Sequence, residues 1–214
     1  MKITLLCSDP LHPVCSYLED WMRVANSLWA IELVHEVEQA AGGDILFLVS
    51  CSAIISKSVR SRYGASLVLH ASDLPVGKGW SPHIWELSQG AESITLSLLE
   101  AEEKVDSGRI WKKLNIQVPK DALWNEINHM LFQAELKLIE FAIKNYQLVE
   151  PQPQTSGVST VIYPRRTEAN SRIDPFKSIA EQFDLIRVCD PVRFPAFFDY
   201  LGNRYLFKVE KSNE

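Results

Sequence analysis

A histidine and an aspartate 36 residues apart are the side chains of this sequence best suited to acid–base chemistry. His70 follows a strand-like segment, and Asp106 precedes a serine and a glycine. A positioned histidine exchanges protons near neutral pH and, once protonated, donates a hydrogen bond to an oxyanion. A carboxylate beside it orients the ring, favours its charged form and relays a proton. With Ser72 as a further polar group, the pair is the candidate for acid–base catalysis in this sequence.

The segments before His70 alternate between strand-like and helix-like patterns, which is typical of a parallel sheet covered by helices. We expect strands over residues 3–7, 29–34, 44–49 and 66–69, and helices over residues 14–24 and 54–63. The third strand is almost wholly apolar, so both of its faces should be buried. Doubly wound sheets bind ligands at the carboxyl ends of their strands, where His70 would lie.

The segments after His70 should bring Asp106 back to it. We expect a helix over residues 80–87, strands over residues 93–99 and 109–118, and a long helix over residues 121–146 with apolar residues every three or four positions. Prolines and a glycine at residues 151–157 mark a break. We therefore predict a catalytic domain over residues 1–150 and a small subdomain over residues 158–214, with a strand at 160–163, a helix at 178–188 and a hairpin at 198–209.

The composition excludes several classes of protein. The net charge of −5 and the pI of about 5.6 argue against a partner held through phosphate contacts, so no nucleic acid is expected. The four cysteines have no metal-ligand spacing, so we expect reduced thiols, no metal and a cytoplasmic protein. No apolar run reaches the roughly 20 residues that span a bilayer. Ser8-Asp9-Pro10 replaces the glycine turn of dinucleotide-binding proteins.

Two motifs carry a resemblance to a known family. The sequence reads LHASDLPVGKGWSP over residues 69–82 and VDSG over residues 105–108. Together they resemble the active-site signature of folate-dependent formyltransferases. Most members of that family carry an asparagine two positions before the histidine, whereas this chain has Val68. The resemblance implies a Rossmann-like, mostly parallel α/β sheet with a small C-terminal α+β appendage.

It also implies transfer of a formyl group from 10-formyltetrahydrofolate to an amine, with His70, Asp106 and Ser72 as the catalytic residues. Two loops would hold the folate, and the residues implied there are Ser50, Cys51, Ser52, Ala53, Ile54, Glu102 and Val105. Val68 cannot supply the neutral donor that the family's amide gives to the oxyanion. Three substitutes are open: a backbone N–H of residues 77–79, the hydroxyl of Ser66 or Ser72, or His70 alone.

The acceptor is indicated by the C-terminal segment, which is similar to the tails of bacterial sugar N-formyltransferases. That likeness implies a nucleotide-linked deoxyamino sugar for a surface glycan, and the residues expected to bind it are Lys78, Gly79, Trp80, Pro82, Arg165 and Arg166. Arg109, Arg187 and Arg193 are further candidates to meet an anion such as a diphosphate, and Phe194 and Phe197 to stack on a base.

Other readings stay open. The amine could be that of glycinamide ribonucleotide, or the protein could be a degenerate folate- or sugar-nucleotide-binding protein, as Val68 suggests. Methionyl-tRNA formyltransferases resemble the same motifs, but they are longer and carry a basic barrel. The apolar residues 194–198 suit a homodimer contact or the tail's own core.

Overall fold

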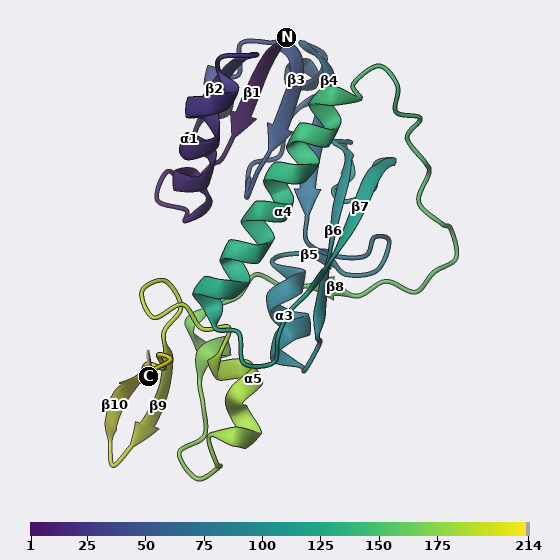
Figure 1. The fold of residues 1–214 in the computed structure, drawn as a ribbon. Helices are drawn as coiled ribbons and strands as arrows, with labels where there is room; N and C mark the ends of the chain where they lie inside the picture. The colour runs from purple at the N-terminus through teal and green to yellow at the C-terminus, as the bar shows by residue number, and fades with distance from the viewer. Residues whose placement is uncertain (213–214) are drawn as a thin grey trace.

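A six-stranded sheet forms the body of the protein in this computed structural model, which describes residues 1–212 (Figure 1). Its strand order is β2-β1-β3-β4-β6-β7. The bounds are β1 (Lys2–Leu6), β2 (Ala30–Val34), β3 (Gly43–Leu48), β4 (Tyr63–His70), β6 (Ser93–Glu100) and β7 (Ile110–Gln117). The first four strands in this order run parallel, whereas β6 runs antiparallel to both neighbours. The expected Rossmann-like, mostly parallel sheet is confirmed.

Helices cover the two faces of the sheet unequally. On one face, α1 (Val14–Ala25) and α4 (Trp124–Lys144) pack against a large apolar core that includes Leu67 and Leu69 of β4. The other face carries only η1 (Val37–Gln39) and α2 (Lys57–Arg60) over a smaller core. Because side chains alternate along a strand, Val68 belongs to this second face.

The helix expected over residues 54–63 is wrong beyond one turn. Only α2 (Lys57–Arg60) is helical, and β4 already begins at Tyr63, which pairs with Gly43 of β3. The Tyr63 hydroxyl also donates to Thr4 Oγ1 at 3.0 Å inside the core. A short apolar pattern does not distinguish a helix from a strand. Here the backbone pairing with β3 makes the segment from Tyr63 onward a strand.

The break predicted at residues 151–157 is a long crossing rather than a simple linker. After α4 the chain runs across the far edge of the sheet and returns beside β5 (Lys78–Gly79), as Figure 1 shows. There β8 (Ile162–Tyr163) pairs in parallel with β5. Earlier in the crossing, Gln152 and Ile110 exchange two backbone hydrogen bonds of 2.7 and 2.9 Å. We call residues 150–166 the crossing segment.

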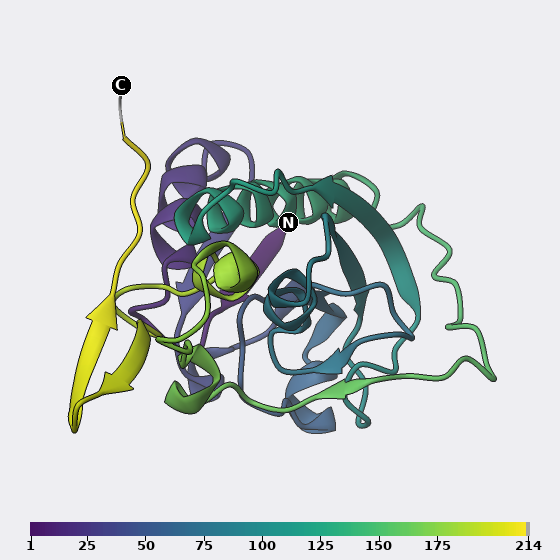
Figure 2. The same ribbon diagram turned by 90° about the horizontal axis from the view of Figure 1, so that it is seen from below.

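The C-terminal residues pack onto the end of the body below α3 (Pro82–Ser88) (Figures 1 and 2). They form η2 (Glu168–Ser171), η3 (Ala180–Gln182), α5 (Phe183–Ile186) and a hairpin of β9 (Ala196–Tyr200) and β10 (Asn203–Phe207). The helix expected over residues 178–188 is therefore shorter and partly 3-10. Arg187 fixes this region, because its buried guanidinium donates to the carbonyls of Leu87, Ala91 and Pro119.

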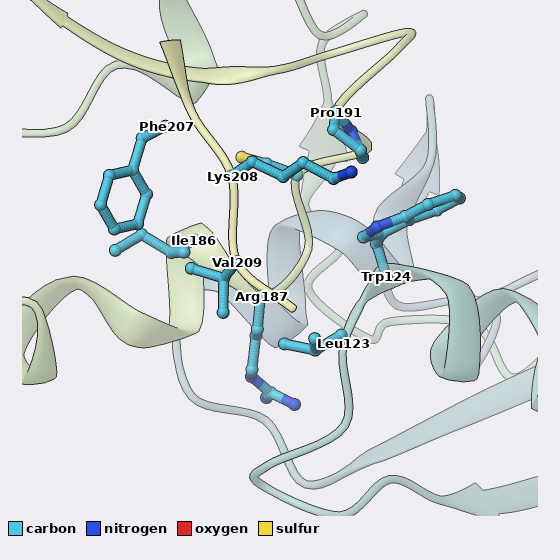
Figure 3. A pocket seen from close by; sticks show the side chains of 9 residues that line it. Leu123, Trp124, Ile186, Arg187, Pro191, Phe207, Lys208 and Val209 are labelled. Atoms are coloured by element: carbon cyan, nitrogen blue, oxygen red, sulfur yellow. The ribbon is translucent and has the colours of Figure 1, made fainter. Parts of the chain in front are cut away.

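The last described strand leads into a segment that covers the start of α4. Figure 3 shows Lys208 and Val209 between Phe207 and Ile186 on one side and Leu123 and Trp124 on the other, with Arg187 below Val209. The space left between them is about 10 Å³, which is room for about one water molecule. This pocket is therefore part of the packing and holds no substrate. Among residues 1–212 no helix is long and apolar enough to cross a membrane.

The long helix α4 carries the apolar stripe predicted for it, with one polar exception. Its buried residues include Ile127, Leu131, Leu138 and Ala142, and the Glu126 carboxylate accepts the N–H of Leu123 at its start. Glu135 is also buried, and its Oε2 has no hydrogen-bond partner. Burial raises the pKa of this carboxyl to about 8, so the folded protein holds a proton that the unfolded chain releases.

We therefore expect stability to fall as the pH rises. Between about pH 5 and pH 8 the native state holds the Glu135 proton, whereas the unfolded state has largely released it. As the pH rises through this range, the free energy of unfolding therefore falls by on the order of 3 kcal/mol. The Glu135→Gln variant should lose this part of the pH dependence in urea unfolding measured across that range. Glu19→Gln, which changes an exposed carboxylate, is the control. Equal pH slopes for wild type and Glu135→Gln would contradict the prediction.

Candidate active site

His70 ends β4 with both ring nitrogens facing hydrogen-bond acceptors. Its Nδ1 lies 3.4 Å from Asp106 Oδ1, and its Nε2 lies 2.9 Å from the carbonyl oxygen of Gly77. The residue is only 8% exposed, so these contacts fix the ring. A carbonyl oxygen only accepts, so Nε2 is the donor in its contact with Gly77. The structure thus brings together the histidine and aspartate that the sequence predicts.

Asp106 ties three segments of the chain together. One carboxylate oxygen faces His70, and the other accepts the N–H of Gly79 at 3.0 Å. Its side chain is 7% exposed. The helix α3 and the strand β6 supply the return path between the two residues, as expected. Asp106 therefore holds the glycine loop against the carboxyl end of β4.

Gly79 is the point where the crossing segment meets this loop. A Cβ at Gly79 would stand 2.4 Å from the carbonyl oxygen of Tyr163, and its φ is +94°. That carbonyl accepts the N–H of Trp80 at 3.0 Å, and the N–H of Lys78 donates to Val161 at 2.8 Å. Only glycine permits this approach, so β8 lies directly against the backbone that holds Asp106.

Left-handed backbone is concentrated around the site. Among residues 1–212, four non-glycine residues have positive φ: Ser50 at 46°, Ser81 at 46°, Asp106 at 55° and Leu201 at 49°. The first three lie in the loops after β3, before α3 and after β6. Such conformations are unfavourable for residues with a Cβ and persist where surrounding contacts impose them. The loops near His70 are therefore held in place by their neighbours.

The two loops implied to bind folate lie beside Val68. Cys51 and Ala53 of one loop, Ala101 of the other and Val68 all pack against the same buried cluster. Ile54, Glu102 and Val105 are exposed, and Ile54 and Val105 present apolar surface. One backbone donor is already used, since the N–H of Ser52 donates to Ser8 Oγ at 2.8 Å.

The serines considered as oxyanion donors do not reach the surface of the site. Ser72 is fully buried and Ser66 is 9% exposed, and neither hydroxyl has a hydrogen-bond partner. Ser72 lies beneath Gly77, whose Cβ would approach Ser72 Oγ to 3.4 Å. The expectation that Ser72 contacts the reacting group therefore does not fit this conformation. Val68 offers no polar atom, and the N–H groups of Lys78 and Gly79 already donate to Val161 and Asp106, which leaves the N–H of Gly77 and His70 as candidate donors.

The residues expected to bind the acceptor divide into two groups. Lys78 and Gly79 lie in β5, and the exposed ring of Trp80 is covered by the Arg165 guanidinium at 5.1 Å. Arg166 is instead engaged within the fold, where it donates to the carbonyl of Asn170 and to Ser171 Oγ. Pro82 is buried as the first residue of α3. Lys78, Trp80 and Arg165 are thus the side chains of this set that remain accessible.

Four further residues proposed to meet an anion or a base are also engaged in the fold. Arg187 is buried against carbonyl groups, and Arg193 pairs with Asp9 at 2.7 Å. Arg109 pairs with Glu100 at 2.7 Å. Phe197 is 2% exposed, with the Arg204 guanidinium 4.0 Å from its ring centre. None of these four side chains faces His70 with a free group.

Some residues of the site carried no sequence signal. Gln154 donates to the carbonyl oxygens of Asp106 and Gly108, and Tyr163 hydrogen bonds to Glu86. Burial raises the pKa of the Glu86 carboxyl. Trp85 stacks on Tyr163 with an 8° angle between the rings. The spacing of Trp85 and Glu86 suggested only a helix, and Gln154 directly follows Pro153 in a segment without a periodic pattern, so the sequence did not point to these contacts.

Residues 10–143 match the family profile described as formyl transferase, which is more than half of the chain. The chain belongs to the formyl transferase family. The match includes His70, Asp106 and the segments between them, and the protein is a formyltransferase. Within residues 1–212 no group of three or more histidines, cysteines and carboxylates is arranged to hold a metal ion.

Solved structures share the fold of this formyltransferase at low sequence identity. Methionyl-tRNA formyltransferase from Clostridium thermocellum has a TM-score of 0.80 at 19% identity over 95% of this chain and 90% of that chain. HypX from Aquifex aeolicus in complex with tetrahydrofolic acid gives 0.78 at 18% over 95% and 36%. A 4-N formyltransferase from Francisella tularensis gives 0.71 at 14% over 100% and 98%.

The contact at Gly79 predicts a local effect of adding one methyl group. Gly79→Ala should lower the free energy of unfolding by about 2–4 kcal/mol, because the new Cβ meets the Tyr163 carbonyl. It should also slow formyl transfer, because it displaces the N–H that binds Asp106. Gly157→Ala is the matched control, since Gly157 has a φ of +77° but no atom within 4 Å. Thermal melting and transfer assays that show equal losses for both variants would contradict the prediction.

Proposed function

We propose that this formyltransferase moves a formyl group from 10-formyltetrahydrofolate to the amine of a nucleotide-linked deoxyamino sugar, in the cytoplasm and for a bacterial surface glycan. The observation that carries the reaction is the contact of His70 with Asp106 at the end of β4, closed by the N–H of Gly79. Parallel sheets place ligand sites at that edge.

The proposed chemistry assigns one role to each group. The amine nitrogen attacks the formyl carbon, the new C–N bond forms, and the oxygen becomes an oxyanion before the bond to the folate nitrogen breaks. In the structure His70 Nε2 contacts the carbonyl oxygen of Gly77 at 2.9 Å. During the reaction the oxyanion would take the place of this carbonyl oxygen as the acceptor. Asp106 holds the imidazolium and takes up the amine's proton through water. This proton is then passed to the folate nitrogen as its bond to the formyl carbon breaks.

Support for the folate site comes from the two loops beside Val68. Their small residues Ser50, Cys51 and Ala53 leave main-chain groups open, and Ile54 and Val105 offer apolar contact for a flat ring. The neighbouring HypX structure is a complex with tetrahydrofolic acid and has the same fold. We therefore assign Ser50, Cys51, Ser52, Ala53, Ile54, Glu102 and Val105 to the donor side.

Support for the sugar acceptor comes from the opposite side of the glycine loop. Trp80 is 41% exposed, and Arg165 lies over one face of its ring, so an apolar ring and a cation lie next in sequence to Gly79, whose N–H binds Asp106. A nucleotide sugar carries a pyranose and a diphosphate, which suit these two groups. A sugar N-formyltransferase from Shewanella aligns over 99% of this chain and 98% of its own, with a TM-score of 0.71 at 11% identity.

A homodimer is a separate proposal. Ala196 and Phe197 are buried in the tail's own core, so the contact expected over residues 194–198 would shift to the hairpin. Leu201 and Leu206 there are 79% and 70% exposed. The alternative acceptor, glycinamide ribonucleotide, and the alternative role as a degenerate binding protein are tested by the experiments below.

The reaction is tested with 10-formyltetrahydrofolate and a panel of UDP-, dTDP- and GDP-linked amino sugars, with glycinamide ribonucleotide included. Mass spectrometry should show one formyl group added to a nucleotide sugar. His70→Ala and Asp106→Asn should each slow the transfer by about 100-fold or more, because each removes a group that handles charge or protons. Formylation of glycinamide ribonucleotide alone would overturn the acceptor assignment, and unchanged rates in both variants would overturn the roles of the pair.

Val68 gives a test of the degenerate alternative. Because the half-buried Val68 packs against an apolar cluster, an amide there would lose apolar contact and part of its hydration, and Val68→Asn should lower stability by about 1–3 kcal/mol. Its transfer rate should be unchanged or lower. Val68→Ala, which removes volume without adding a polar group, is the control. A tenfold or greater gain in rate for Val68→Asn alone would show that the site has lost its donor.

A further inference from the structure

Gln154 reaches from the crossing segment to the loop that carries Asp106. Its side-chain amide nitrogen lies 3.0 Å from the carbonyl oxygen of Asp106 and 2.9 Å from that of Gly108. Both contacts are partly buried, and the two carbonyls converge on one NH₂ group. We propose that Gln154 is a positioning residue for Asp106, so that a side chain outside the motifs sets the geometry of the catalytic pair. This inference rests on the proposed function.

The loop needs such a partner because of its backbone. Asp106 has a φ of 55°, a conformation that is unfavourable for a residue with a Cβ. Gly108 is packed so closely that a Cβ would stand 1.9 Å from the Glu100 carbonyl oxygen. The turn between them directs two carbonyl oxygens outward to the same side. An amide with two hydrogens is suited to bridge both oxygens.

Backbone contacts of the crossing segment, before and after Gln154 in the sequence, hold this residue beside the loop. On one side Gln152 exchanges two backbone hydrogen bonds with Ile110, and on the other β8 pairs with β5. Pro151 and Pro153 flank Gln152 and restrict the backbone on the N-terminal side of Gln154. The backbone pairing of Gln152 with Ile110 therefore anchors the chain two residues before the amide.

Loss of the amide should act on the pair and not on substrate affinity. The Asp106 and Gly108 carbonyls would turn toward water, and the backbone of Asp106 could relax from its left-handed conformation. Its carboxylate would then leave Nδ1 of His70, which now lies 3.4 Å away. The loss should therefore appear in kcat, with KM for the acceptor nearly unchanged.

The test compares Gln154→Ala and the isosteric Gln154→Glu with Gln152→Ala, whose side chain only bonds the Glu150 carbonyl. We expect kcat to fall about tenfold in both Gln154 variants, equivalent to about 1.4 kcal/mol, and to stay unchanged in Gln152→Ala. In an Asp106→Asn background, Gln154→Ala should have no further effect, whereas a merely structural contact would reduce the rate in both backgrounds.

The outcomes separate this inference from the proposed function. If Asp106→Asn is inactive but Gln154→Ala keeps full kcat, or if the two changes are additive, the inference is overturned and the proposed function stands. An active Asp106→Asn overturns the proposed roles first. Hydrogen exchange of residues 104–109 needs no acceptor: it should be faster in Gln154→Ala than in Gln152→Ala, and equal exchange would overturn the inference.

Discussion

The carboxylate of Asp106 is the constraint on which the rest of this site depends. Its two oxygens serve different segments, one the His70 ring and the other the N–H of Gly79. The side chain is almost fully buried, so water cannot replace either contact cheaply. Moving the carboxylate toward one partner would release the other. The end of β4, the glycine loop and the loop after β6 are therefore positioned as a unit.

That unit is held from outside by the crossing segment. Gln154 contacts the Asp106 loop, and Tyr163 lies against Gly79. Farther along, the buried guanidinium of Arg187 fastens the C-terminal residues to the ends of α3 and β7. Polar contacts thus dock the second half of the chain at two places, and those of Gln154 and Tyr163 lie next to the segments that hold His70 and Asp106. Arginines that a sequence reading assigns to substrate are used for this docking.

The sequence was sufficient where apolar patterning determines structure. Four parallel strands, the long helix α4 and the placement of His70 at a strand end follow from buried apolar runs, and all are confirmed. Patterning was insufficient where a tertiary contact decides the outcome. Pairing with β3 extends β4 to Tyr63, where the residue pattern had suggested a helix. The crossing segment has no periodic pattern of apolar residues, because hydrogen bonds at a few positions hold it in place. The sequence also did not predict the burial of Glu135. A glutamate is normally exposed, but its position on α4 places this one in the core.

The most direct test of this arrangement is a double-mutant cycle between His70 and Asp106. Single-turnover formyl transfer would be measured for His70→Ala, Asp106→Asn and the double variant. If Asp106 works by holding the His70 ring, the double variant should be no slower than the slower single variant. If the two losses multiply instead, the residues act independently, and the shared carboxylate cannot be what organises the site.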